Sequence, residues 1–501
     1  MWFKDKYWIS AAEWAVRLAE RCDYVLAPKP MQQLTPRCLP LEFSSILSHK
    51  HTYGLVCPKD SVFRLSLSWL EAIRTFKVIY ADDVFAVMST GEIPGVGLAD
   101  EEEISRNLPY LWSKVDDVLK KKQARKNRVD EALTTAGPVD PYCLIINACL
   151  AGNAGEVLLA EAAREVIQQA RPDLRCIVAD PDIDRTLVAG ASLVVIGPGG
   201  MLYDLVDHEE LALDFQNVAN YFRHCYIARE YNRPVCLLGI AQQARVISRT
   251  TLKYVRGAIS DALFINTRDT ESASVFIQRL GFENPVCVTP DVAVVFSDKI
   301  REMARRPTER RTIAVCGVFG VGTLVSAFSN FDGRVRLILQ GKEDVAWFQQ
   351  NEHALRNDIP NVEVVDVTSV GQGPSGSGGA EPFLEAVATT DGLLTSRFHA
   401  MMIALIAGID TLVSGIANDK RHRVCVSIGS PPWVHFIDAM VEREEELLAR
   451  AARVVAFGRR DPQRGCFDSS ELDSIRQLLR VGADQSPALA SCSAGYPLPS
   501  C

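Results

Sequence analysis

The chain has 501 residues, of which 48% are hydrophobic and 23% charged, and it carries a formal net charge of −8. This length exceeds what one hydrophobic core usually supports, and the composition excludes wholesale disorder, so two or three folded domains are expected. The acidic balance argues against a general binder of the nucleic-acid backbone.

The sequence gives no sign of membrane insertion or of a metal site. No run reaches 18 apolar residues, and residues 1–10 lack the continuous apolar segment of a secretion signal, so we expect a cytoplasmic protein without a transmembrane segment. The 14 cysteines are scattered, without a C-x-x-C pair or metal-ligand spacing, which is typical of buried thiols in a reduced protein. We therefore expect no metal and no bound cofactor.

Residues 1–140 contain an aromatic cluster before residue 15, proline-containing loops and helical patterns near 9–21 and 104–122. They show no phosphate-binding loop or catalytic set, so they are interpreted as an accessory extension of mixed or mainly helical structure and as a candidate oligomerisation region. The aromatic cluster is expected to pack within this extension, with peripheral contact at a membrane as the alternative. The basic run at 120–128 is interpreted as a solvated helix face or linker.

From residue 142 onward, short apolar runs alternate with helix-length segments. Such runs are typical of a parallel sheet covered on both faces, because its strands contact no water. One series precedes the basic segment at 300–311 and a second series follows it. The pattern predicts the α/β class with two facing doubly wound, Rossmann-like domains, at 141–300 and at 308–480 with C-terminal helices, and a flexible tail at 481–501. Ligands of such sheets usually bind at the carboxyl ends of the strands, so we expect the site in the cleft between the domains.

The first glycine-containing motif, at 151–156, follows the first strand of this series and opens a helix. Glycines there allow a ligand to approach the backbone, and the amino end of the helix supplies unpaired N–H groups suited to an anion. Asn153, Gly155 and Glu156 are therefore candidate substrate-binding residues. The motif fits a tight strand-to-helix turn equally well, and it lacks the Lys-Ser/Thr of a phosphate-binding loop.

The second motif, at 197–204, places a glycine cluster and a carboxylate after the strand at 191–197. Gly199 and Gly200 clear space over the cleft, and Asp204 is a candidate general base or ligand for hydroxyl groups. A role for Asp204 as a helix N-cap or loop residue is the alternative.

A third motif carries an arginine between a strand at 262–266 and a helix. From this position the guanidinium of Arg268 can grip a carboxylate or phosphate through two hydrogen bonds. A structural ion pair with Asp269 or Glu271 is the alternative. Asp291, after a later short strand, is either a cleft residue or a helix cap.

Arg397 and His399 stand where the strand at 392–396 meets a helix of small and apolar residues. A guanidinium and an imidazole at such a junction can combine anion binding with proton transfer near neutral pH, so both are interpreted as functional. In the basic segment at 418–423, Lys420 is the residue expected to complete a cationic pocket.

Taken in order, these motifs resemble those of the polysaccharide pyruvyl transferase family. Its members show G-N-x-G-D, G-G-G-x-L-x-D, R-D-x-E-S followed by T-P-D, and R-[LF]-H, and this chain has GNAGE, GPGGMLYD, RDTES with TPD, and RFH. The resemblance spans residues 142–430. Glu156 replaces the usual aspartate, and residues 238–243 differ from the usual G-Q-G-I-G-P loop.

The resemblance implies a glycosyltransferase-B-like pair of domains. It also implies transfer of pyruvate from phosphoenolpyruvate, the donor substrate, to two hydroxyls of a saccharide acceptor, which forms a cyclic ketal. Arg268, Arg397 and Lys420 would then bind the carboxylate and phosphate of the donor.

In the same reaction His399 is the expected acid, and Asp204 is the expected base, with Glu156 as the alternative. Two other functions stay open. One is a nucleotide-sugar glycosyltransferase, because the same architecture hosts that chemistry. The other is a noncatalytic relative that binds or assembles with partners, because residues 238–243 are altered.

Overall fold

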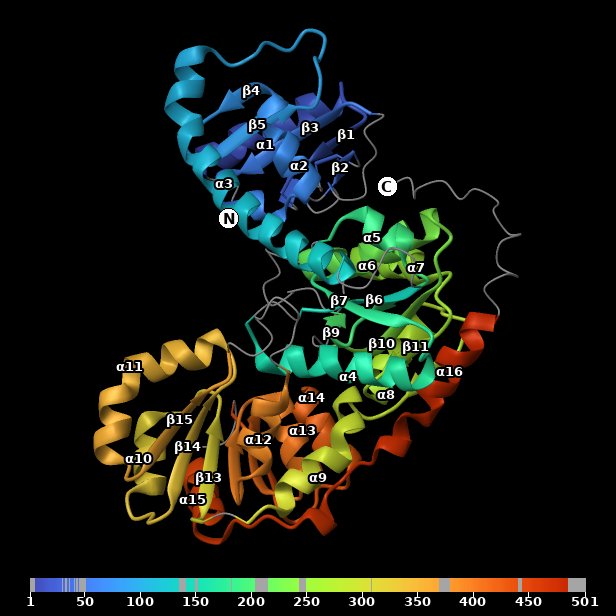
Figure 1. Ribbon diagram of the computed structural model, residues 1–501. Helices are drawn as coiled ribbons and strands as arrows, with labels where there is room; N and C mark the ends of the chain where they lie inside the picture. The colour runs from blue at the N-terminus through green and yellow to red at the C-terminus, as the bar shows by residue number, and fades with distance from the viewer. Residues whose placement is uncertain are drawn as a thin grey trace.

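The computed structural model shows three folded bodies in chain order, with the N-terminal domain at the top of Figure 1 and the two doubly wound domains below it. The described residues are 5–28, 30–31, 34–35, 37–39, 41, 44, 51–134, 141–148, 152–181, 183–202, 215–242, 249–307, 309–368, 379–439 and 444–484. Asp204, Gln243 and most of the predicted tail at 481–501 lie outside these residues.

The N-terminal domain is built on a five-stranded sheet with the strand order β2-β1-β3-β5-β4. Its strands and helices are β1 (Tyr24–Leu26), β2 (Cys38–Leu39), β3 (Tyr53–Pro58), β4 (Lys77–Ala81), β5 (Phe85–Ser89), α1 (Lys6–Ala19), α2 (Leu67–Ala72) and α3 (Glu101–Thr134). Strands β1, β2 and β3 pair in parallel, whereas β5 is antiparallel to both β3 and β4. The helices α1 and α3 correspond to the helical patterns expected in this extension, and the sheet makes the domain mixed. Helix α3 runs from this domain down to the next one (Figure 1).

The first doubly wound domain has a parallel sheet with the strand order β12-β11-β10-β8-β6-β7, and β9 pairs with β10. Its elements are β6 (Tyr142–Ile146), α4 (Ala154–Ala170), β7 (Arg175–Ala179), α5 (Arg185–Gly190), β8 (Leu193–Ile196), β9 (Gly199–Leu202), α6 (Phe215–Glu230), β10 (Val235–Gln242), α7 (Arg249–Ile259), β11 (Ile265–Thr267), α8 (Thr270–Ser274) and β12 (Val286–Val288). Figure 1 shows α4 on one face of this sheet and α5, α6 and α7 on the other. Alternate residues of β6 therefore enter different cores: Cys143 and Ile145 pack with α4, and Leu144 and Ile146 pack with α5 to α7.

The second doubly wound domain has a parallel sheet with the strand order β15-β14-β13-β16-β17-β18. Its elements are β13 (Thr312–Cys316), α10 (Val321–Phe328), β14 (Arg334–Leu339), α11 (Lys342–Asp358), β15 (Val362–Asp366), α12 (Glu381–Ala388), β16 (Gly392–Thr395), α13 (Phe398–Ala407), β17 (Asp410–Gly415), α14 (Lys420–Ser427), β18 (Val434–Asp438) and α15 (Glu444–Phe457). The α/β class and the two doubly wound domains predicted from the sequence are confirmed.

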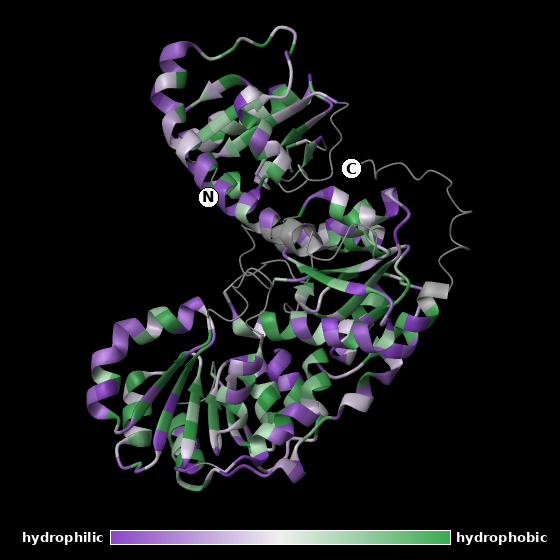
Figure 2. Ribbon diagram, viewed as in Figure 1, coloured by the Kyte–Doolittle hydropathy of each residue, from purple (hydrophilic) through white to green (hydrophobic). Residues whose placement is uncertain are grey.

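One hydrophobic core is shared by the two doubly wound domains. Every residue of α13 is buried, as expected for a helix that is apolar all around, and its side chains join the same cluster as those of α4. Figure 2 shows this interior as predominantly hydrophobic, with hydrophilic residues on the outer faces of the helices. A shared apolar interface of this kind fixes the relative position of the domains more firmly than the polar interfaces of mobile domains.

Two helices cross between the domains, which the boundaries predicted at 141–300 and 308–480 do not anticipate. Helix α9 (Ser297–Arg305) packs against α12 and α13, and α16 (Asp473–Asp484) returns to pack against α4. The apolar residues of the C-terminal segment, Leu472, Ile475 and Leu479, bury themselves in the shared core. The buried apolar face of each helix therefore determines the domain against which that helix packs.

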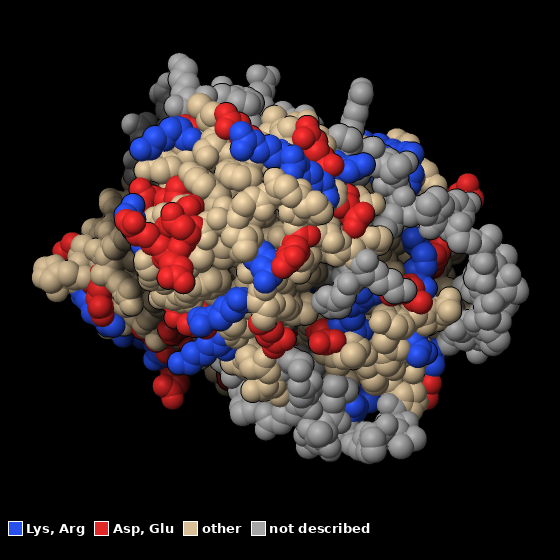
Figure 3. Space-filling view, turned by 90° about the horizontal axis from the view of Figure 1, so that it is seen from above, with Lys and Arg blue, Asp and Glu red and all other residues tan. Residues whose placement is uncertain are grey.

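Among the described residues, no helix has both the length and the apolar character needed to cross a membrane. The face of the molecule seen in Figure 3 carries several groups of acidic and basic side chains, among them one acidic cluster at the left of the view.

Candidate active site

The candidate site lies where the amino ends of α4 and α13 approach each other across the two domains. Gly155, in the first turn of α4, lies against His399, in the first turn of α13. A β-carbon built on Gly155 would lie only 2.1 Å from His399 Nδ1 and 2.7 Å from Gln340 Nε2. Only glycine therefore permits this contact, so Gly155 serves close packing between the domains.

The N–H groups in the first turn of α4 are already hydrogen-bonded within the protein. Asn153 is the N-cap, and its Oδ1 accepts from the backbone N–H of Gly155 at 2.9 Å. The N–H of Ala154 donates to the carbonyl of Gln340 at 3.0 Å, and that of Glu156 donates to the carbonyl of Asn153 at 3.0 Å. The expectation of unpaired N–H groups for an anion is therefore wrong for residues 154–156, because the opposite domain and Asn153 satisfy them.

Arg268 and Asp291 form an ion pair inside the site. Arg268 Nη1 donates to Asp291 Oδ2 at 2.7 Å, and the two side chains are 3% and 0% exposed. Asp291 also caps the following turn by accepting from the N–H of Ala293. Burial acts to raise the pKa of Asp291, but Arg268, His399 and the N–H of Ala293 together outweigh it, so the pKa is lowered. The partner of Arg268 is thus Asp291, and neither of the adjacent carboxylates considered from the sequence.

The other edge of the Arg268 guanidinium has no protein partner. Its Nε and Nη2 are buried and make no hydrogen bond within the described structure. Buried donors are normally satisfied, and an unpaired donor on a charged group is costly. The pair of free N–H groups matches the fork that a carboxylate or phosphate accepts. Arg268 therefore presents two buried, unpaired donors on one edge, in the geometry that an oxyanion accepts.

His399 presents a second unpaired atom to the same site. The residue is 4% exposed, and its Nε2 is buried without a hydrogen-bond partner in the described structure. Burial lowers the pKa of His399 to about 3, with Lys420 and Arg268 acting in the same direction and Asp291 opposing them. With this pKa the imidazole is neutral near pH 7, and the approach of an anion would favour its protonation.

Lys420 and Glu156 are the further titratable groups facing this centre. Burial, together with the Arg268 cation, lowers the pKa of Lys420 to about 8. Burial raises the pKa of Glu156, although Lys420 and Arg268 act against that rise. Within the described part of the chain, neither side chain forms an ion pair. Both groups can therefore exchange protons closer to neutrality than an ordinary lysine or glutamate.

The ring of Phe398 lies between the cations and the imidazole. Its centroid is 4.9 Å from Arg268 Cζ and 5.1 Å from Lys420 Nζ, and it meets the His399 ring edge to face at 5.3 Å. Cation–π attraction of this kind is stronger when the cation is desolvated. Phe398 therefore packs against both positive groups of the site.

Gly199 lies beside Glu156, whereas Asp204 lies outside the described residues. A β-carbon on Gly199 would lie 3.7 Å from Glu156 Oε2, and the backbone there has φ +155°. Gly200 follows in the same strand, β9, and is partly buried. The Met201 side chain lies closer to the same point, at 3.2 Å. The space that Gly199 and Gly200 are expected to clear over the cleft stays a prediction.

Arg397 is held by carboxylates of α11. Its Nε donates to Asp344 Oδ1 at 3.0 Å, its Nη2 donates to Glu343 Oε2 at 2.9 Å, and the Asp344 side chain is 1% exposed. The structure therefore brings together Arg268, His399, Lys420 and Glu156, and places the Arg397 guanidinium in a separate ion pair.

Sequence reasoning missed two residues that join the domains at the site, Gln340 and Arg423. Arg423 Nη2 donates to the carbonyl of Gln242 at 2.9 Å, and its guanidinium pairs with Asp269 and Glu271. Gln340 follows β14 at a strand-to-helix junction, which is the kind of position that yielded the other candidates. Asp269 and Glu271, next to Arg268, were a further signal for Arg423, because two neighbouring carboxylates favour a basic partner.

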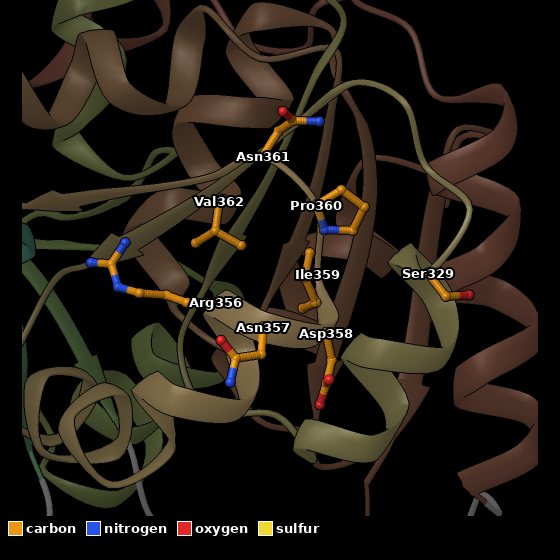
Figure 4. Close-up of a pocket in the computed structure, with 8 residues that line it drawn as sticks. All are labelled: Ser329, Arg356, Asn357, Asp358, Ile359, Pro360, Asn361 and Val362. Carbon is orange, nitrogen blue, oxygen red and sulfur yellow. The ribbon is translucent and has the colours of Figure 1, made fainter.

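Within the described residues, no group of three or more His, Cys, Asp and Glu side chains is arranged to hold a metal ion. A hollow elsewhere on the second doubly wound domain is lined by Ser329 and residues 356–362 (Figure 4). It lies before the amino end of β15, whereas the candidate site lies at the carboxyl ends of the strands. The hollow includes none of the candidate residues.

Comparison with known proteins supplies one family. The family model described as polysaccharide pyruvyl transferase matches residues 153–418, and no curated protein matches the sequence. Among solved structures, the chain is similar to a glycosyltransferase from Rickettsia africae ESF-5, with 8% identity, a TM-score of 0.40, and coverage of 71% of this chain and 100% of that one. It is also similar to a UDP-GlcNAc 2-epimerase from Methanocaldococcus jannaschii, with 10% identity, a TM-score of 0.41, and coverage of 68% and 99%.

Proposed function

The chain belongs to the polysaccharide pyruvyl transferase family, and on that premise we propose that it transfers pyruvate from phosphoenolpyruvate to two hydroxyls of a sugar or glycan. The product is a cyclic ketal, and inorganic phosphate is released. The observation that carries the proposal is the set of buried, unpaired polar atoms in one site: Arg268 Nε, Arg268 Nη2 and His399 Nε2. An anion with several oxygens, such as this donor, satisfies all three.

The donor carries a carboxylate and a phosphate, which require fixed cations. The free edge of Arg268 takes one of these groups in a two-bond contact, and Lys420 neutralises the other. Asp291 holds Arg268 in place through the opposite edge of the guanidinium, at 2.7 Å. The ion pair therefore orients the cation before the donor arrives, so little reorganisation is needed on binding.

Proton transfer starts from His399. The negative charges of the donor raise the pKa of His399 from its low value in the empty site, so the ring takes up a proton. The imidazolium then protonates the methylene carbon of the enol, a C–H bond forms, and the neighbouring carbon becomes electrophilic. A first acceptor hydroxyl attacks this carbon and forms a C–O bond.

Glu156 is the base that we assign to the hydroxyl groups, because its pKa is raised and its carboxylate interacts electrostatically with Lys420 and Arg268 of the same site. Asp204 stays a prediction for the same role. The second hydroxyl then forms its C–O bond as the bond from the same carbon to the phosphate oxygen breaks. One hydroxyl proton replaces the proton given by His399, and the other leaves with the phosphate.

The test is release of inorganic phosphate from phosphoenolpyruvate by the purified protein, with and without a pool of glycan acceptors. We expect release that depends on the acceptor, and an acid-labile pyruvyl group on the glycan by mass spectrometry. His399→Gln should abolish release while keeping the circular dichroism spectrum. Turnover of a nucleotide sugar without dependence on phosphoenolpyruvate would support the glycosyltransferase alternative. No turnover of either donor with any acceptor would support the noncatalytic one.

A further inference from the structure

Gln340 lies at the carboxyl end of β14 and ties the second doubly wound domain to α4 of the first. It is 2% exposed. Its side-chain Nε2 donates to Asn153 Oδ1 at 2.9 Å, and its backbone carbonyl accepts from the N–H of Ala154 at 3.0 Å. One residue therefore holds both the N-cap side chain and the first helical N–H group of α4 from across the domain boundary.

Gln340 is itself held by Asp344. Asp344 Oδ2 accepts from the N–H groups of Gln340 at 3.0 Å and of Gly341 at 3.1 Å, and Oδ1 accepts from Arg397 Nε at 3.0 Å. Arg397 is the N-cap residue of α13, and Asn153 is the N-cap residue of α4. A continuous set of hydrogen bonds therefore links the starts of the two helices that carry His399 and Glu156.

The hydrogen bond from Gln340 to Asn153 lies next to the contact between Gly155 and His399. Gln340 Nε2 and His399 Nδ1 both lie against Gly155, at 2.7 Å and 2.1 Å from where its β-carbon would stand. A small displacement of the start of α4 away from Gln340 would open the space beside the imidazole. Glu156 is the next residue of the same turn, so it would move with Gly155.

We propose that Gln340 is a positioning residue for the transfer, whose side chain holds the start of α4, with Gly155 and Glu156, against His399. The assignment rests on the proposed function for its effect on turnover, but the geometry that it predicts at His399 does not. Gln340 contacts neither reacting group and acts through Asn153.

The test is the protonation of His399 in Gln340→Leu, followed by NMR of ring-labelled histidine and assigned with His399→Asn. The charged groups that face the ring are Asp291, Lys420 and Arg268, and the variant changes none of them. The wild-type ring should stay neutral from about pH 8.5 down to about pH 5. In Gln340→Leu water should reach the ring, which should then protonate within that range, toward the ordinary value of about 6.5.

The matched control is Gln169→Leu at the other end of α4. Gln169 Oε1 accepts from Arg476 Nε at 3.0 Å and is exposed, so this variant also loses a side-chain hydrogen bond between α4 and a later element. Its His399 titration should equal that of the wild type. Asn153→Ala removes the acceptor of the same bond from the other side and should reproduce the effect of Gln340→Leu, which covers the case in which that variant fails to fold.

Turnover supplies the second readout. In Gln340→Leu, kcat for phosphate release should fall by about tenfold, which corresponds to the loss of one hydrogen bond, and donor affinity should change less than threefold. A lower kcat with an unchanged His399 titration in both variants would mean a general structural role and would overturn the proposal. If the wild type shows no turnover, the proposed function fails, whereas the titration still decides whether Gln340 positions His399.

Discussion

Gly155 and His399 touch across the two doubly wound domains so closely that a single methyl group on Gly155 would overlap the imidazole, at 2.1 Å from Nδ1. The contact places a helix start of one domain against the candidate acid of the other. The sequence alone does not reveal this contact, because 243 residues lie between Gly155 and His399.

Gly155→Ala is therefore expected to push α4 and α13 apart at the site. We expect kcat for phosphate release to fall by about 100-fold or more, because displacements of about 1 Å at a reacting group cost that much. The control is Gly322→Ala in α10, where an added β-carbon meets nothing within 4 Å. That variant should keep full activity and gain up to about 1 kcal/mol of stability, because alanine is the better helix former. Full activity in Gly155→Ala would refute the assigned geometry.

Arg268→Lys keeps the positive charge and removes the forked edge formed by Nε and Nη2. Because a lysine cannot make the two-bond contact, the affinity for phosphoenolpyruvate should fall by about 10- to 100-fold, or roughly 1.5 to 3 kcal/mol, in isothermal titration. The control is Arg74→Lys on the N-terminal domain, where the ion pair with Asp116 is 52% and 64% exposed. Binding that is equally strong in Arg268→Lys would show that the donor anion lies elsewhere.

The doubly wound part of the fold follows from the sequence because its strands are buried on both faces. Runs such as Leu193–Ile196 are apolar at every position, which leaves little choice of structure. In the N-terminal sheet, which was not predicted, the strands β1 and β2 have only 3 and 2 residues. Such short segments carry no readable period, and their pairing is decided by tertiary contacts.

The site was predicted where a residue type and its strand-to-helix position together indicate chemistry, as for Arg268, His399 and Lys420. Position alone does not reveal partners that are distant in the chain. Arg397 fits the same rule as His399, yet its charge is taken up by Asp344. A buried carboxylate that accepts two backbone N–H groups is not visible before the fold is known.

Phe398→Leu removes the ring that supports both Arg268 and Lys420. Leucine is an accepted residue at this position of the motif, so the fold should be retained. The loss of two cation–π contacts, each worth about 0.5 to 2 kcal/mol, should weaken binding of phosphoenolpyruvate by about 5- to 1000-fold. Phe398→Tyr keeps an aromatic face and should bind the donor within about threefold of the wild type. Isothermal titration of both variants measures the difference, and equal affinities of Phe398→Leu and Phe398→Tyr for phosphoenolpyruvate would show that the aromatic ring does not contribute to donor binding.

Arg423→Gln should loosen the contact between the two domains on the side opposite to Gln340. Its guanidinium bonds to the Gln242 carbonyl and to two carboxylates while only 15% of the side chain is exposed, so the loss should lower the free energy of unfolding by about 1 to 3 kcal/mol. Arg356→Gln, which breaks an exposed pair with Glu352 within α11, is the control and should cost at most about 0.5 kcal/mol. Urea unfolding of the two variants provides the comparison, and equal midpoints would contradict a role for Arg423 between the domains.

Lys420 should give donor binding a pH dependence on the alkaline side. Its pKa is lowered to about 8 because burial and the Arg268 cation disfavour the charged form. Below that value the ammonium is present and attracts the donor. Above it the free protein loses the charge, so the affinity for phosphoenolpyruvate should weaken, by up to about tenfold for each further pH unit. Lys420→Arg stays charged throughout, and its affinity should remain level between about pH 7 and 9.5. Isothermal titration across this range tests both proteins, and a wild-type affinity as level as that of Lys420→Arg would show that the ammonium does not contact the donor.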